Sequence, residues 1–86
     1  MTDAEEWRAG FAGIEVLDSA FSEAVVTFQD GSSLRFRHRV GERWAKAEGH
    51  GLAQYYLTRL SFFRLNAKHL EIRLRDGTTW EARFRG

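Results

Sequence analysis

Cysteine and proline are both absent from this chain of 86 residues. Without cysteine there can be no disulfide bridge, thiolate zinc site or cysteine nucleophile, so stability has to come from packing or from a partner subunit, as in a reducing cytoplasm. Long apolar runs are also missing. The longest segment free of Asp, Glu, Lys and Arg is Gly49–Thr58, about half of what a membrane-spanning helix needs. The N-terminus is acidic where a signal peptide is basic. We therefore expect a cytoplasmic protein with no membrane association.

Patterns that carry chemistry are equally scarce. The three histidines His38, His50 and His69 share no short spacing, so we expect no metal site. Gly49-His50-Gly51 lacks the third glycine and the Lys-Ser/Thr ending of a phosphate-binding loop, and no serine or aspartate forms a nucleophile motif beside His50. The sequence predicts no catalytic residues, no cofactor and no enzyme activity.

Charge is present, and it is distributed unevenly. The formal net charge is +1. Residues 1–23 carry six acidic side chains and one basic one, a balance of −5, whereas residues 24–86 carry twelve basic and six acidic side chains, a balance of +6. Arginine outnumbers lysine 11 to 2, which favours planar contacts to carboxylate or phosphate but is also produced by a GC-rich genome.

A repeat appears when the sequence is shifted by 46 residues. The shift places Ala24–Leu34 over Leu70–Trp80, and both segments alternate apolar and polar residues before an Asp-Gly pair. Alternation flanking Asp-Gly is typical of a β-hairpin, because the glycine accepts the positive φ of a tight turn. Duplication and two unrelated hairpins explain the repeat equally well.

Side-chain parity restricts the second hairpin to a three-residue loop. A loop at Asp76–Thr78 sets Leu74 opposite Trp80 on the core face and pairs opposite charges on the polar face, so we favour it. A loop at Arg75–Gly77 keeps the same parity but sets Glu71 opposite Glu81.

The other elements follow from capping and periodicity. Thr2 with Glu5 forms a capping box for a short N-terminal helix. Ile14–Phe21 and Leu60–Ala67 are expected as strands, and Val40–Glu48 and Leu52–Leu60 as helices. We predict one sheet-rich α+β domain over 1–86: an N-terminal helix at 1–12, a first β-meander at 13–39, a helical connector at 40–60 and a second β-meander at 61–86.

This layout resembles a known family. Phe28-Gln-Asp-Gly31 and Leu74-Arg-Asp-Gly77 are similar to the Asp-Gly hairpins of a family of small bacterial domains of unknown function, some of them encoded beside small toxin candidates. The resemblance runs from about Ile14 to Phe84. It implies a non-enzymatic partner of another small protein, such as an inhibitor or antitoxin.

Arginines recur on the polar side of both predicted hairpins. If the hairpins share one sheet, seven arginines lie on one face against Glu71 and Glu81. This face would bind a phosphate backbone or an acidic protein, or would simply be solvated. The candidate residues are Arg35, Arg37, Arg39, Arg73, Arg75, Arg83 and Arg85.

Aromatic residues are dense between Tyr55 and Phe63. Neighbours such as Tyr55 and Tyr56 cannot both point into one core, so one of each pair is expected near the surface, unless the N-terminal helix covers it. The candidate partner-binding residues are Tyr55, Tyr56, Arg59, Phe63 and Arg64. The expected function is a protein-interaction module, with a homodimer as one form; the alternative is nucleic-acid binding through the arginine face.

Overall fold

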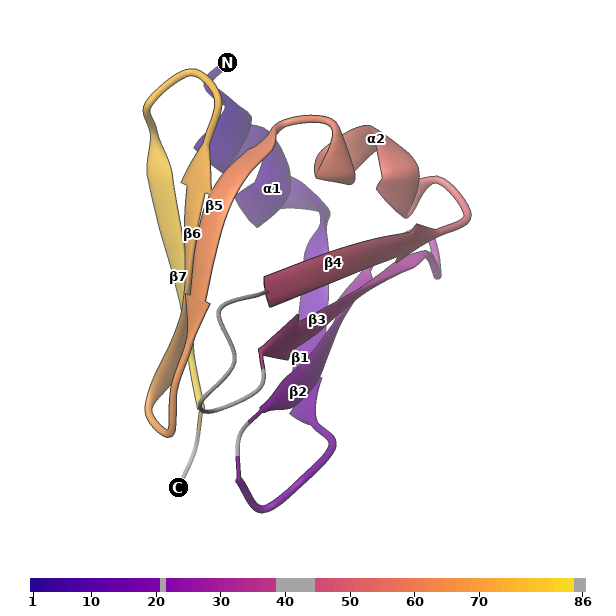
Figure 1. Cartoon of the computed structure of the whole chain (residues 1–86). Helices are drawn as coiled ribbons and strands as arrows, with labels where there is room; N and C mark the ends of the chain where they lie inside the picture. The colour runs from indigo at the N-terminus through magenta and orange to yellow at the C-terminus, as the bar shows by residue number, and fades with distance from the viewer. Residues whose placement is uncertain (21, 39–44, 85–86) are drawn as a thin grey trace.

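The computed structural model describes residues 1–20, 22–38 and 45–84, which form two antiparallel sheets and two short helices (Figure 1). In chain order the elements are α1 (Asp3–Gly10), β1 (Phe11–Val16), β2 (Glu23–Phe28), β3 (Ser33–His38), β4 (Ala45–His50), α2 (Ala53–Leu57), β5 (Leu60–Leu65), β6 (His69–Leu74) and β7 (Thr79–Arg83). The prediction of a sheet-rich α+β fold is confirmed.

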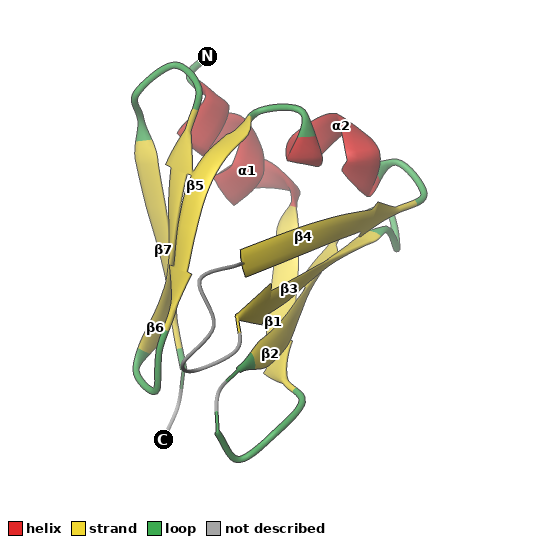
Figure 2. Ribbon diagram, in the orientation of Figure 1, coloured by secondary structure: helices red, strands yellow, loops and turns green. Residues whose placement is uncertain are grey.

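The two sheets enclose one core. The first sheet has the order β1-β2-β3-β4 and the second has the order β5-β6-β7. Both helices lie at the same end of the two sheets (Figure 2). The core takes its largest fully buried side chains from α1 and from both sheets: Trp7, Phe28, Phe36, Leu34, Leu70, Ile72, Leu74 and Val26. The outer faces of the two sheets therefore point away from each other.

The first helix begins where its cap predicts. Thr2 is the N-cap, and its hydroxyl accepts the Glu5 N–H at 3.1 Å, which satisfies one of the unpaired donors of the first turn. The helix buries Ala4 and Trp7 and ends at Gly10. The chain enters β1 directly, so the first strand begins at Phe11, earlier than predicted, and ends at Val16.

Both Asp-Gly turns have the same geometry. The Leu74 N–H donates to the Thr78 carbonyl at 2.9 Å, and Gly77 has a φ of +87°. The loop is therefore Arg75–Gly77, and the favoured loop at Asp76–Thr78 is wrong. The left-handed position of a three-residue hairpin loop is its last residue, and Gly77 occupies it at no steric cost.

The like-charge pair that argued against this loop is real but accommodated. Glu71 opposes Glu81 in the ladder. The ring Nε2 of His69 lies 3.9 Å from the Glu71 carboxylate and 3.7 Å from that of Glu81. Arg83 Nε donates to Glu81 at 2.7 Å, and this permanent cation reduces the repulsion between the two carboxylates.

The predicted helix at Val40–Glu48 is wrong where the structure describes it. Ala45–His50 is strand β4, antiparallel to β3, with Phe36 opposite Ala47 and Arg35 opposite Glu48. Charged Lys46 and Glu48 alternate with small residues, and this period of two fits a strand on the edge of β3. Residues 40–44 lie outside the described residues. The second predicted helix is confirmed over Ala53–Leu57, and β5 begins at Leu60 as expected.

The two halves of the chain repeat more than their hairpins. Each helix is followed by a strand with a bulge at its start, between Phe11 and Gly13 in β1 and between Leu60 and Phe62 in β5. The Gly10 carbonyl accepts Gln29 N–H, and the Arg59 carbonyl accepts Arg75 N–H in the equivalent place. Helices and first strands correspond at a shift of 49 residues and the hairpins at 46, because the first connecting loop is three residues longer.

Candidate functional site

The aromatic segment is divided between core and surface. Tyr56 is stacked on Phe28, with ring centroids 4.0 Å apart and an interplanar angle of 2°, and it meets the edge of Trp7 at 5.9 Å. Burial raises the pKa of the Tyr56 hydroxyl, with smaller contributions from the charges of Asp30 and Glu6. Phe63 packs on Phe36 at 4.9 Å. Tyr56 and Phe63 are thus half-buried side chains that pack against the core.

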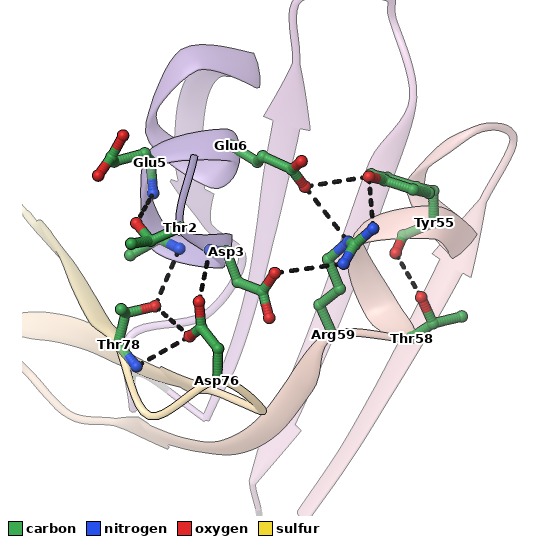
Figure 3. Close-up of polar contacts among 10 residues, drawn as sticks. Thr2, Asp3, Glu5, Glu6, Tyr55, Thr58, Arg59, Asp76 and Thr78 are labelled. Carbon is green, nitrogen blue, oxygen red and sulfur yellow. Dashed lines mark hydrogen bonds and ion pairs between the residues drawn. The ribbon is translucent and has the colours of Figure 1, made fainter.

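Tyr55 and Arg59 hold the N-terminal helix in place (Figure 3). The Tyr55 hydroxyl donates to Glu6 at 3.0 Å and accepts from Arg59 Nη2 at 2.6 Å, while the guanidinium lies over the Tyr55 ring at 4.4 Å. Arg59 Nη1 donates to Asp3 at 3.2 Å, and its Nε lies 3.2 Å from Glu6 without hydrogen-bond geometry. The hydrogen bond to Tyr55 and the two carboxylates raise the pKa of Arg59.

The partner-binding residues predicted from sequence are therefore not brought together as one surface. Tyr56 and Phe63 face the core, and Tyr55 and Arg59 are engaged with α1. Arg64 is exposed on β5, on the outer face of the second sheet opposite Glu71. The N-terminal helix contacts Tyr55, Tyr56 and Arg59, whereas the Tyr55 and Phe62 side chains stay exposed.

A second anchor ties α1 to the second hairpin (Figure 3). Asp76 accepts the Asp3 N–H at 2.8 Å, and the Thr78 hydroxyl accepts the Ala4 N–H at 3.1 Å. These bonds satisfy two donors of the first helical turn. The Asp3 N–H, followed by the hydroxyl and N–H of Thr78, lowers the pKa of Asp76.

The described arginines of the two hairpins do not form one continuous face. The two hairpins lie in different sheets whose outer faces point apart, so the shared sheet on which that surface depended does not exist. Arg35 and Arg37 both pair with Glu23, at 3.1 and 3.3 Å.

The second hairpin disperses its arginines in the same way. Arg83 pairs with Glu81 at 2.7 Å, Arg73 lies 5.9 Å from the Phe62 ring, and Arg75 is in the turn. Arg39 and Arg85 lie outside the described residues. Each outer face mixes acidic and basic groups, which weakens the case for a phosphate-binding surface.

The surface that sequence reasoning missed is the open edge of β1. Leu17 N–H donates to the Glu23 carbonyl at 2.9 Å. Because hydrogen-bonded residues alternate along an antiparallel ladder, Gly13 and Glu15 also bond to β2, whereas Ile14 and Val16 direct their N–H and C=O groups away from it. Within the described chain no strand lies on that side of β1.

A groove runs along this edge. It has a volume of about 730 Å³ and is lined by Phe11, Ala12, Gly13, Ile14, Glu15, Val16, Arg83 and Phe84. One wall is β1, and the other is the end of β7 with the residue that follows it. Ile14 opposes the buried Val26, and Val16 opposes the buried Ala24, so both side chains are on the apolar inner face.

Position 13 of this edge is a glycine although its surroundings do not require one. A Cβ at Gly13 would meet no atom of the described residues within 4 Å, and the φ of Gly13 is not positive. The bulge does not demand glycine, because the equivalent residue in β5 is Phe62. Glycine weakens a strand and often marks a place where another backbone approaches closely. This glycine inside a period-two segment is the sequence signal that could have identified the edge.

Comparisons with known proteins give no match to a protein-family model, a curated protein or a solved structure. No helix among the described residues is long and apolar enough to cross a membrane. In the same part of the chain, no three His, Asp or Glu side chains are grouped so that they could hold a metal ion.

Proposed function

We propose that this protein is a non-enzymatic protein-interaction module that binds a strand of another polypeptide along the open edge of β1. The observation that carries the proposal is the pairing pattern of β1: the backbone N–H and C=O groups of Ile14 and Val16 point into an open groove. An extended segment placed there adds a strand to the sheet, so main-chain hydrogen bonds supply affinity and the groove selects side chains.

The groove defines the kind of segment that fits. The side chains that point inward meet Phe11, Ile14 and Val16 and should be apolar. Those on the outer face pass beside Glu15 and should not be acidic, since like charges directly opposite destabilise a ladder. An inhibitor or antitoxin is a specific case of this proposal and depends on the resemblance carried by the Asp-Gly hairpins alone.

Proline substitution tests the edge directly. Ile14→Pro removes an N–H that faces the groove and leaves the bonds to β2 unbroken, since proline is tolerated where the N–H side of a strand is unpaired. The matched control is Thr79→Pro in β7. Thr79 opposes Arg73 in the ladder, next to the hydrogen-bonded pair Leu74 and Thr78. Because hydrogen-bonded pairs alternate, the Thr79 N–H points away from β6.

The experiment is affinity capture of tagged chain from cells of the source organism, with mass spectrometry of bound proteins and circular dichroism of each variant. Proteins that co-purify with the wild type and with Thr79→Pro should be lost from folded Ile14→Pro. Capture that is unchanged by Ile14→Pro would contradict the proposal.

A further inference from the structure

If the edge of β1 binds a strand, as the proposed function states, the structure also indicates which strand binds there. We infer that the occupant is β1 of a second copy of the chain, paired antiparallel about a twofold axis that passes beside Ile14. The two four-stranded sheets then form one continuous sheet.

The side-chain pattern of β1 matches the groove beside it. The groove takes apolar residues on the inner face and non-acidic residues opposite Glu15. In β1, Ile14 and Val16 are on the inner face, so the strand has the apolar inner positions that its own groove requires. Its outer-face Glu15 fits in a register that does not set it opposite the other Glu15. An isologous interface needs this self-complementarity.

The register between the two β1 strands is restricted by their backbones. The residues that direct N–H and C=O groups outward must pair with the same kind of residue in the other copy, so only a few registers are possible. With Ile14 opposite Val16 of the second copy, the two Glu15 side chains oppose each other, and this is destabilising. With Ile14 opposite Ile14 of the second copy, Glu15 opposes Gly13 on the other chain. The favoured register therefore places the bare glycine opposite the only charged side chain of the strand.

This pairing also accounts for the glycine at position 13. Among the described residues nothing requires a glycine at this position, because a Cβ there would have open space around it. In the paired edge, position 13 of each copy faces the Glu15 carboxylate of the other. A small residue there lets the two carboxylates keep their hydration, and a charged residue there should change the affinity of the pair according to its sign.

The test is sedimentation equilibrium of the full chain and of folded variants over a range of concentrations. The wild type and Thr79→Pro should form a species of about 20 kDa, twice the chain mass of 10.0 kDa, and Ile14→Pro should remain near 10 kDa. A wild type that stays at the mass of one chain at every concentration, or a dimer that persists in Ile14→Pro, would overturn the inference.

A pair of charge variants tests the register without proline. Gly13→Lys should tighten the dimer and Gly13→Glu should weaken it, with dissociation constants that differ by about tenfold, because two cross-strand pairs change sign. In a Glu15→Gln background the difference should vanish. Equal dissociation constants for the two variants in the native background would overturn the register.

Failure of this inference and failure of the proposed function are distinguishable. A monomeric chain that captures some other protein through Ile14 would leave the strand-binding function intact and exclude the second copy as occupant. If neither the chain itself nor any captured protein depends on Ile14, both proposals fail.

Discussion

The Asp76 carboxylate accepts the backbone N–H of Asp3 at 2.8 Å, across 73 positions of sequence. This bond joins the turn of the last hairpin to the first turn of α1. Asp30, at the equivalent place in the first hairpin, accepts only local bonds from Ser32 among the hydrogen bonds of the described residues. The same turn motif therefore shapes a loop in one half and anchors a helix in the other.

This difference predicts unequal effects of two matched substitutions. Asp76→Ala should lower Tm by several degrees, because it removes the loop bonds to Thr78 and leaves the Asp3 N–H without its partner. Asp30→Ala should lower Tm less, since only loop bonds are lost. Thermal unfolding followed by circular dichroism measures both, and equal shifts would show that the Asp3 contact contributes nothing.

Stability should fall in acid, and Asp76 should contribute to the fall. Hydrogen bonds lower the pKa values of Asp18, Asp30 and Asp76 below the ordinary 3.8. A carboxylate whose pKa is depressed in the folded state contributes stability above its unfolded pKa, and this contribution is lost as pH falls through the folded pKa. Urea unfolding between about pH 6 and about pH 3 should show the decline. Asp76→Asn should make the dependence of the unfolding free energy on pH shallower below pH 3.8. An unchanged slope would show that Asp76 does not contribute to the loss of stability in acid.

Two glycines near the start of the chain should respond in opposite ways. A Cβ at Gly10 would lie 2.8 Å from Tyr56 Cζ and still closer to its hydroxyl, and the stacked ring cannot withdraw easily. Gly10→Ala should therefore cost about 1–3 kcal/mol of unfolding free energy. Gly13→Ala meets open space and should gain about 0.5–1 kcal/mol. Denaturant unfolding measures the change in unfolding free energy of each variant. Equal changes would contradict the packing of α1 on Tyr56.

The core contains a donor without an acceptor. Trp7 is fully buried, and its indole N–H has no hydrogen-bond partner among the described residues. Trp7→Phe removes that donor and keeps most of the apolar ring, so the loss of unfolding free energy should stay below about 2 kcal/mol. Trp80→Phe removes the same atoms from a side chain that has no such unpartnered donor, and it should cost more. A larger loss of unfolding free energy in Trp7→Phe than in Trp80→Phe would contradict this prediction.

The sequence predicted the parts of the fold that depend on local physics. Thr2 caps α1, the Asp-Gly pairs form three-residue turns, and apolar alternation fixes the inner faces of both hairpins. The wrong loop at Asp76–Thr78 came from weighing the Glu71–Glu81 repulsion without Arg83, which pairs with Glu81, or His69, which lies near both carboxylates in the folded chain. A cross-strand neighbour of this kind depends on register and is not visible in a linear pattern.

Long-range placement could not be predicted in the same way. Whether two hairpins share a sheet is decided by which edges pair, and β4 covers the edge of β3 that would otherwise have been available. The arginines were consequently divided between two faces. The contacts of Tyr55 and Arg59 with α1 could not be predicted, because their partners, Asp3 and Glu6, lie about fifty positions away in sequence.

Amide hydrogen exchange of β1, measured residue by residue by NMR, tests the central claim most directly. In dilute protein the N–H groups of Ile14 and Val16 should exchange rapidly, while that of Glu15, bonded to β2, should be protected. At concentrations where the chain self-associates, or in complex with a captured partner, Ile14 and Val16 should become protected as well. Rapid exchange of both residues in a fully formed complex would contradict binding at the edge of β1.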